Sequence, residues 1–240
     1  MPQVLRDCKL IVGKYDMSGK MNALALNATV EQLDDTVFGD DTKSSAAGLK
    51  AVEFQHEGLF DTGTDGADDV FYNNLAVADT PVIISPDTLA EGNLAYFFKS
   101  LQSKYSINSK VGQLLSFSVG GSGRGSDLVR GKSLLNGTKT ATGNSTPIQL
   151  GAVSSVKKLF AALHILAASG GTPSLTVKVQ SSATSGGTYV DRLTFAAQNA
   201  AGAVWGTPTS GPVTDTWWRI NYTISGSTPS FNFIVPVGIQ

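Results

Sequence analysis

The stretch "SGGTPSLTVKV" (169–179) recurs as "SGSTPSFNFIV" (225–235), so the frame Ser-Gly-x-Thr-Pro-Ser-apolar occurs twice, 56 positions apart. Glycine permits positive φ, proline fixes φ, and Ser and Thr hydrogen-bond the local backbone, which is the chemistry of a tight turn. An alternating strand follows each frame. We therefore predict two similar hairpins, and a β-sandwich of jelly-roll or immunoglobulin-like type for this half of the chain.

The segment before each frame is also predicted to be a strand. "TWWRINYTIS" (216–225) alternates clearly, and "AVSSVKKLFAALHILAAS" (152–169) occupies the equivalent place before the first frame. Alternation places Trp217 on one face and Trp218 on the other. Three roles stay open for these tryptophans and for Trp205: the sandwich core, a subunit interface, or stacking on a sugar.

Charge divides the chain. Residues 1–138 carry a net charge of −5 and residues 139–240 a net charge of +4, within a whole-chain formal charge of −1. Between them lies the polar, glycine-containing stretch "NGTKTATGNSTP" (136–147), typical of a linker or exposed loop. We predict two domains, 1–138 and 139–240. The near-neutral total does not favour nucleic acid as a specific ligand.

The first domain is predicted to be mainly β with one short flanking helix. Strands at 8–15 and 21–30 are expected to form a hairpin, followed by a long acidic loop over 31–48. A loop of that length inside a compact domain is usually functional or ordered by a partner. Further strands and the helix are expected at 49–60 (strand), 65–76 (helix), and 80–86, 94–107 and 112–123 (strands).

Sequence motifs for catalysis or cofactor binding are absent. There is no nucleophile elbow, phosphate-binding loop or zinc-binding helix, and the single Cys8 cannot form an intrachain disulfide. His56 and His164 each lie in a predicted strand and are expected to be packed or paired. The acidic loop lacks the spacing of a calcium loop. We expect no enzyme activity, no metal and no cofactor.

The order of these elements resembles that of phage tail tube proteins, also called major tail proteins. A strand pair is followed by the acidic segment "LDDTVFGDDTKSSAAGLKAVEF", the strand "AVEFQHEGLF", a helix, and "AYFFKSLQSKYSI" before closing strands. The resemblance covers about residues 5–138. The second half resembles the accessory β-sandwich domains of phage virion proteins.

This resemblance implies a tail-tube-like sandwich or barrel and assembly into stacked homo-oligomeric rings. It favours hexamers, with trimers if the second half is tube-like as well. Other tail proteins would be partners, and DNA would pass through the lumen without specific binding. It also implies an inter-subunit loop made of Leu33, Asp34, Asp35, Phe38, Asp40 and Asp41. The protein would belong to the virion tail and assemble in the host cytoplasm, without a membrane partner, since no run approaches ~20 apolar residues.

Two other functions are open at this stage. A capsid-decorating or host-glycan-binding virion protein would use the C-terminal sandwich and its tryptophans. A hydrolase would use Glu53 and Glu57, which lie on one face of a predicted strand but about 13 Å apart along it. That separation is too large for a retaining carboxylate pair.

Overall fold

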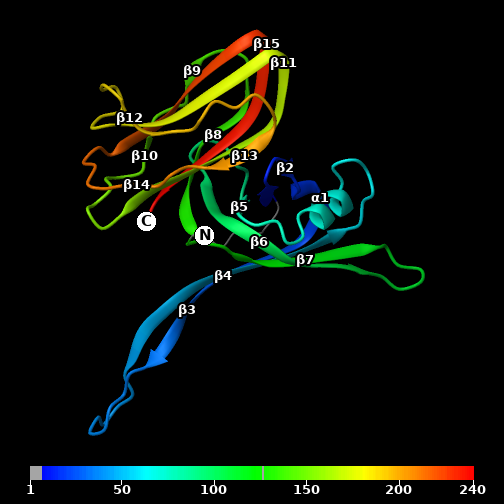
Figure 1. The fold of residues 1–240 in the computed structure, drawn as a ribbon, viewed down its shortest axis with the longest axis vertical. Coiled ribbons are helices and arrows are strands. Elements are labelled where there is room, and N and C mark those ends of the chain that lie inside the picture. Colours follow the sequence, from blue (N-terminus) through cyan, green and yellow to red (C-terminus); the bar gives the residue numbers. More distant parts are fainter. Residues whose placement is uncertain (1–6, 126) are drawn as a thin grey trace. The chain divides into compact units, whose positions relative to one another are not determined.

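The computed structural model describes residues 7–125 and 127–240, which form a mainly β protein with one α-helix (Figure 1). The mainly β class and the single flanking helix are confirmed. The elements are β1 (Lys9–Val12), β2 (Tyr15–Asp16), a 3-10 turn (Ser18–Lys20), β3 (Met21–Asp34), β4 (Ser45–Leu59), α1 (Ala67–Asn73), β5 (Thr80–Ser85), β6 (Leu94–Asn108), β7 (Ser116–Gly123), β8 (Val129–Lys139), β9 (Gly143–Asn144), β10 (Ile148–Gln149), β11 (Lys158–Ser182), β12 (Val190–Thr194), β13 (Gly202–Trp205), β14 (Thr209–Ser210) and β15 (Trp217–Ile239).

The chain divides into two compact units. Of the described residues, unit 1 comprises 7–19, 80–98 and 129–240, and unit 2 comprises 20–79, 99–125 and 127–128. This division differs from the one predicted from charge, because both units are discontinuous in sequence. The position of the predicted boundary, between 138 and 139, falls at the end of β8 within unit 1. The division of the chain into domains 1–138 and 139–240 therefore stays a prediction.

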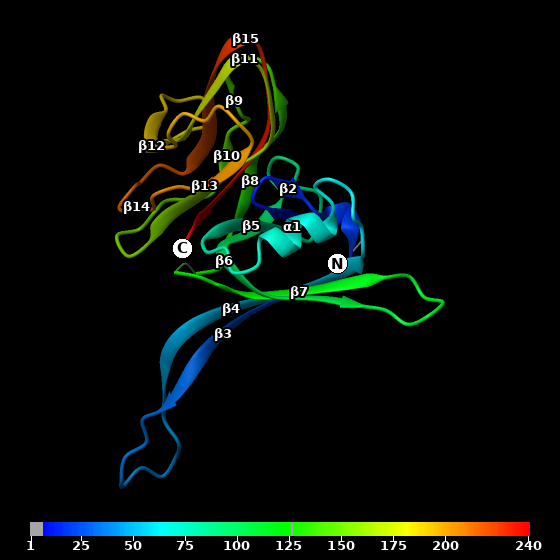
Figure 2. The same ribbon diagram turned by 45° about the vertical axis from the view of Figure 1, so that its right-hand side comes forward.

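Unit 1 is built on two exceptionally long antiparallel strands, β11 and β15, which pair from Leu159 opposite Ile239 to Ser182 opposite Trp217. The two repeated frames do not make hairpins, so that prediction is wrong. Each frame is instead a bend within one long strand, and the two bends face each other, with Gly171 opposite Ser227. Figures 1 and 2 show both strands turning over together at this point.

The backbone of the frames explains the double bend, which we call the corner (169–173 with 225–229). Gly170 and Gly226 have φ of +116° and +125°, and a Cβ on Gly226 would lie 2.9 Å from the carbonyl oxygen of Gly171. Thr172 and Thr228 both have φ of 48°. The residues that suit a turn therefore redirect the strand, while the ladder continues on both sides of the corner.

The corner lets two strands supply both layers of a β-sandwich. The halves of β11 and β15 on either side of it contribute to one buried apolar cluster. Tyr222, before the corner, packs edge-on against Phe233, after it, with ring centroids 5.7 Å apart. β12, β9 and β10 extend one layer, which we call the upper layer, and β8, β13 and β14 extend the other, the lower layer. The expected sandwich is thus present, with a shared pair of strands at its centre.

A second cluster lies on the other face of the lower layer and joins it to β1, β5 and β6. His164 of β11 is fully buried here, and its Nδ1 lies 2.7 Å from the carbonyl oxygen of Gly13. Burial lowers the pKa of His164 to about 4, so the ring is neutral at pH 7. His164 is therefore packed, as predicted.

Unit 2 is a four-stranded antiparallel sheet in the order β3–β4–β7–β6, with α1 packed on one face. Phe71 of α1 contacts His56 of β4 and Phe117 of β7, with ring centroids 4.5 Å and 5.2 Å away. The predicted strand at 49–60 and helix at 65–76 are confirmed as β4 and α1, and those at 80–86, 94–107 and 112–123 as β5, β6 and β7.

Two predictions for the start of the chain are wrong. The segment at 8–15 does not pair with 21–30: β1 pairs with β2 and β5, whereas β3 pairs with β4. The predicted loop at 31–48 is too long, because β3 continues to Asp34 and β4 begins at Ser45, which leaves residues 35–44 as the connection. We call β3 together with residues 45–51 of β4 the distal hairpin. Its side chains do not alternate between buried and exposed, so its strands carry no period-2 signal.

Candidate functional site

The sheet of unit 2 has two strand edges with free backbone groups. In the part of the chain that the structure describes, β3 pairs only with β4. At the other side, β6 pairs with β5, and Gln102 forms a bridge with Leu75. Beyond that bridge, the strand recorded beside residues 103–108 is β7 alone. Unpaired edges of this length are templates for pairing with another chain.

The face of this sheet opposite α1 is mainly polar. By register it presents Ala23, Ala25, Asn27, Glu53, Gln55, Glu57, Leu59, Leu101, Lys104, Ser106, Asn108, Ser116, Ser118 and Ser122. Glu53 and Glu57 are exposed, and Gln55 between them donates a hydrogen bond to Glu57 (Nε2 to Oε1, 3.3 Å). The two carboxylates do share one face, as predicted, and they outnumber the single cation of the face, Lys104.

The face beneath α1 is apolar and holds the second histidine. His56 is 1% exposed, and burial lowers its pKa to about 3. Its Nδ1 has no hydrogen-bond partner among the described residues, and its ring packs on aromatic rings. A neutral ring enclosed by aromatic side chains serves packing and has no access to a reacting group. His56 is thus a core residue.

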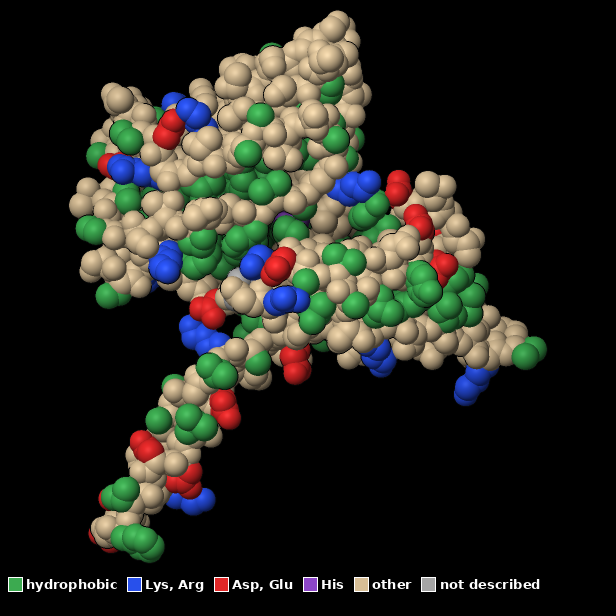
Figure 3. All heavy atoms as spheres, in the orientation of Figure 1, with side chains coloured by type: hydrophobic (Ala, Val, Ile, Leu, Met, Phe, Trp, Pro, Cys, Tyr) green, Lys and Arg blue, Asp and Glu red, His purple; other side chains and the backbone are tan. Residues whose placement is uncertain are grey.

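The hairpin β3–β4 extends well beyond the other strands of unit 2 (Figure 2). It brings together all six residues predicted for an inter-subunit loop: Leu33 and Asp34 end β3, and Asp35, Phe38, Asp40 and Asp41 lie in the connection. We call residues 33–44 the hairpin tip. Apolar and acidic side chains lie together along this hairpin in Figure 3. Contact of the tip with another subunit stays a prediction.

Local hydrogen bonds give the tip a defined shape. Thr36 N–H donates to Asp34 (3.0 Å), and Val37 N–H donates to Asp40 (3.0 Å). The hydrogen bonds from Thr36 lower the pKa of Asp34. Phe38 is fully exposed, and Val37 is 67% exposed. A shaped tip that displays an aromatic ring to water has the character of an interaction site.

The three tryptophans of unit 1 have different environments. Trp218 is fully buried and its indole N–H donates to the Gly151 carbonyl (2.8 Å). Trp205 is half-buried against Phe97, with ring centroids 5.5 Å apart. Trp217 is half-buried on the opposite face of β15 from Trp218. Trp218 is therefore a core residue, and Trp217 is the residue of this pair with an exposed surface.

Polar side chains lie on the same face of β15 and β11 as Trp217. Arg219 lies over the Tyr189 ring, 3.9 Å from its centroid, and donates to Gln180 (2.9 Å). Gln180 in turn donates to Asp191, which also pairs with Lys178 at 2.6 Å. The hydrogen bonds from Lys178 and Gln180 lower the pKa of Asp191.

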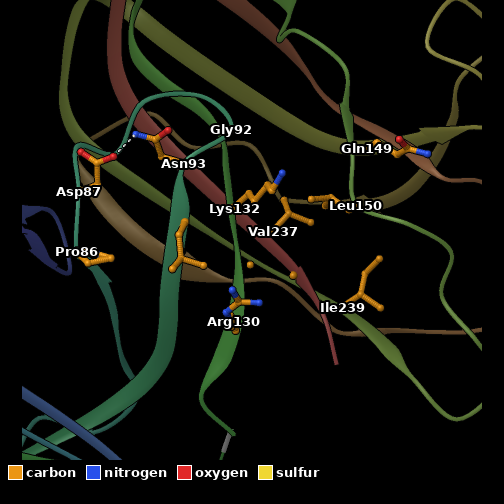
Figure 4. Close-up of a pocket in the computed structure, with 13 residues that line it drawn as sticks. Pro86, Asp87, Gly92, Asn93, Arg130, Lys132, Gln149, Leu150, Val237 and Ile239 are labelled. Carbon is orange, nitrogen blue, oxygen red and sulfur yellow. Dashed lines mark hydrogen bonds between the residues drawn. The ribbon is translucent and has the colours of Figure 1, made fainter. Parts of the chain in front are cut away.

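One feature of unit 1 was missed by the sequence analysis. A pocket of about 610 Å³ is lined by residues from four separate segments, with Arg130 and Lys132 of β8 on one wall (Figure 4). The two cations stand two apart on a strand, so they share a face. That spacing was the available signal, but the remaining wall residues come together only in the folded chain.

In the described residues, no helix is long and apolar enough to cross a membrane. No group of three or more His, Cys, Asp or Glu side chains within residues 7–125 and 127–240 is placed to hold a metal ion.

No protein-family model matches the sequence, and no curated protein matches it in sequence. Solved structures that resemble the chain are tail, tube and hub proteins of phage-like particles. A protein of the "virion of native gene transfer agent (GTA) particle" shares 9% identity over 53% of this chain and 98% of its own, with a TM-score of 0.43. The "SPP1 Dit (gp 19.1)" protein shares 12% identity over 98% of this chain and 100% of its own, with a TM-score of 0.37.

A protein of the "anti-feeding prophage cap (AFP tube terminating cap)" shares 9% identity over 55% of this chain and 92% of its own, with a TM-score of 0.41. At TM-scores below 0.5, these similarities carry no weight for function, which has to be inferred from the geometry of the chain itself.

Proposed function

We propose that this chain is a non-enzymatic structural protein of a phage-type tail, and that its copies assemble into stacked rings that form a tube for DNA ejection. The observation that carries the proposal is the open sheet of unit 2. The outer edge of β3 in one copy pairs with residues 103–108 of β6 in the next copy, so that the sheets join into one closed barrel.

The strand count favours a hexamer over a trimer. Four strands from each of six copies give a barrel of about 24 strands, wider than the 16–18-stranded barrels that already hold an aqueous channel. Three copies would give about 12 strands and a much narrower lumen. Closure also pairs residues 103–108 with part of the β3 edge of the neighbouring copy, which stabilises the ring.

The polar face of the sheet suits the inner wall of such a barrel. With α1 covering the other face, Glu53 and Glu57 line the lumen together with small polar side chains. Carboxylates repel DNA phosphates, whereas a basic lining would bind them and slow passage. DNA therefore passes without specific binding, and other tail proteins cap the ends of the tube. The protein resides in the virion tail after assembly in the host cytoplasm.

Electron microscopy of the purified chain over a concentration series tests this function, with two adjacent proline substitutions in β3 as a matched pair. In an antiparallel strand, successive N–H groups point to opposite edges. Ala28→Pro and Thr29→Pro therefore remove one N–H that bonds to β4 and one that faces the free edge. We expect hollow rings or tubes from the wild type. The variant that loses an N–H bonded to β4 should be less stable. The variant that loses an N–H at the free edge should keep its hairpin and its stability but form no rings.

Two results would contradict the proposal. One is that the wild type stays as discrete particles at every concentration and salt tested. The other is that both proline variants assemble as readily as the wild type once each is shown to be folded by circular dichroism.

A second function is supported by the outer face around Trp217. We propose, as the alternative, that this face binds a host glycan in a decorating or adhesion role. Aromatic rings stack on sugars, and planar amide, guanidinium and carboxylate groups hydrogen-bond to hydroxyls. Trp217→Ala should then abolish binding to host surface polysaccharide. Tyr189→Ala should weaken it, and unchanged binding in both variants would rule out this face. Trp218→Ala is not a suitable test because Trp218 is in the core.

A further inference from the structure

The pocket of unit 1 combines apolar walls with two cations. Pro86, Leu94, Leu150 and Ile239 supply apolar surface, while Asn93 and Gln149 supply amides, as the close-up in Figure 4 shows for most of these residues. The remaining lining residues are Asp87, Gly92, Arg130, Gly131, Lys132, Val237 and Gly238. The volume, about 610 Å³, is that of a typical ligand pocket.

The cations of the pocket lack acidic partners. Neither Arg130 nor Lys132 forms an ion pair within 4.0 Å among residues 7–125 and 127–240. The one acid of the lining, Asp87, accepts hydrogen bonds from Thr88 N–H (2.7 Å) and Asn93 Nδ2 (3.2 Å). The pocket thus offers two positive charges beside apolar surface, which suits an occupant that is both acidic and apolar.

The hairpin tip has the complementary chemistry. Phe38 is fully exposed beside Val37, and Asp35, Asp40 and Asp41 lie within three residues of it. No hydrogen bond or ion pair to the carboxylates of Asp35 and Asp41 is recorded among the described residues. Among the described residues, the tip therefore displays an exposed aromatic ring with two carboxylates that lack partners, while the pocket offers partly buried apolar side chains and two cations that lack partners.

We propose that the pocket of one copy receives the hairpin tip of a second copy of this chain, with Phe38 against the apolar walls and the tip aspartates paired with Arg130 and Lys132. This rests on the proposed function, because it names the receptor for the tip in the stacked assembly. Each copy carries one tip and one pocket, so the contact is heterologous, and repetition of a heterologous contact extends an assembly along an axis. Edge pairing closes the ring, and the contact between tip and pocket joins successive rings.

A charge-swap series on the full-length chain tests the proposal by sedimentation velocity and electron microscopy. The tip variant carries Asp35→Lys and Asp41→Lys, and the pocket variant carries Arg130→Glu and Lys132→Glu. Each alone places like charges in contact, so we expect stacking to weaken about tenfold or more. The chain with all four substitutions should regain stacking, and so should a 1:1 mixture of the two variants.

The control is Lys157→Glu with Lys158→Glu, which makes the same charge change at exposed positions of unit 1 outside the pocket. It should stack like the wild type. Circular dichroism checks that each variant is folded, and Phe38→Ala supplies a second test without charge reversal, with weaker stacking expected.

The outcomes separate this inference from the proposed function. The pairing of tip and pocket is supported if the tip variant and the pocket variant each form unstacked rings and the four-substitution chain forms stacks again. Stacking that survives both reversals, or that the combined swap fails to restore in folded protein, overturns it. If the wild type forms no rings, the proposed function fails. Self-association that is sensitive to the same swaps then still supports the pairing of tip and pocket, and its absence overturns the pairing too.

Discussion

The two long strand pairs of this protein, β11–β15 in unit 1 and β3–β4 in unit 2, differ in what covers them. β11 and β15 bury at least every second side chain over most of their length on either side of the corner. β3 has no buried residue at all, and the distal half of β4 has none before Val52. In both pairs the two strands hydrogen-bond to each other through their backbones, but only β11–β15 has a hydrophobic core of its own.

The difference shows how each pair is stabilised. The corner folds β11–β15 back on itself, so that one strand pair provides both layers of a sandwich. The β3–β4 pair has no bend of this kind, and an isolated two-stranded hairpin is marginally stable in water. Its apolar side chains, Phe38 and Leu49 among them, have no apolar neighbours to bury them within the hairpin. The β11–β15 pair is therefore stabilised by its own core, and we infer that the β3–β4 pair is stabilised by assembly.

The sharpest way to break this comparison is the same substitution in each pair. Phe233→Ala removes a fully buried ring from the sandwich, and we expect the free energy of unfolding to fall by about 3–5 kcal/mol. Phe38→Ala removes a fully exposed ring, and the change should stay within about 0.5 kcal/mol. Urea unfolding of both variants measures this. Equal losses would refute the contrast between the two pairs.

Acidification should lower the free energy of unfolding through His164 of β11. Its folded-state pKa, about 4, lies below the ordinary value of 6.5, so the unfolded state binds the proton first. The stability contributed by the neutral ring is complete above pH 6.5 and is lost as the pH falls towards 4, to a total of about 3 kcal/mol.

Urea unfolding between pH 7 and pH 4.5 measures this loss. His164→Gln removes the titrating ring, so its stability should fall less steeply with pH than that of the wild type. Parallel pH profiles for the two proteins would show that His164 does not titrate as described.

The corner itself is the next test. Gly226→Ala places a Cβ at a left-handed φ of +125° and 2.9 Å from a backbone oxygen, so we expect a loss of about 1–3 kcal/mol in unfolding free energy. Ser227→Ala, at the neighbouring exposed position, should be nearly neutral. Thermal unfolding compares them. If the two variants melt together, the bend does not depend on the glycine.

The smallest effect on stability is expected in the distal hairpin. Leu49 is 81% exposed, so Leu49→Ser should change the free energy of unfolding by less than about 0.5 kcal/mol. Its effect should instead fall on self-association, measured by sedimentation velocity. A clear loss of monomer stability would mean that the hairpin has a core after all.

The sequence was informative where a side-chain period reflects burial. β4 alternates from Val52 onward because one face packs under α1, and its strand was predicted there. His56 and His164 were correctly expected to be packed, because each lies within such a pattern. The six tip residues were grouped through the resemblance to tail tube proteins, and their role between subunits stays a prediction.

The sequence was misleading where the same chemistry serves two geometries. Ser-Gly-x-Thr-Pro suits a hairpin turn and also a bend in a strand, and local residues do not distinguish them. The choice depends on the pairing of Gly171 with Ser227, a contact between segments 56 positions apart. The extension of β3 to Asp34 was missed because a strand exposed on both faces shows no period. The pocket around Arg130 was missed because four distant segments form it.

Hydrogen–deuterium exchange of the full-length chain over a concentration series tests the central claim most directly, because it reads both strand pairs at once. We predict that peptides covering β3 (Met21–Asp34) and residues 103–108 become protected as concentration rises, while peptides of β11 and β15 exchange slowly and equally at every concentration. Uptake in β3 and at 103–108 that does not change with concentration, in samples where particles form, would contradict closure of the sheet by a neighbouring copy.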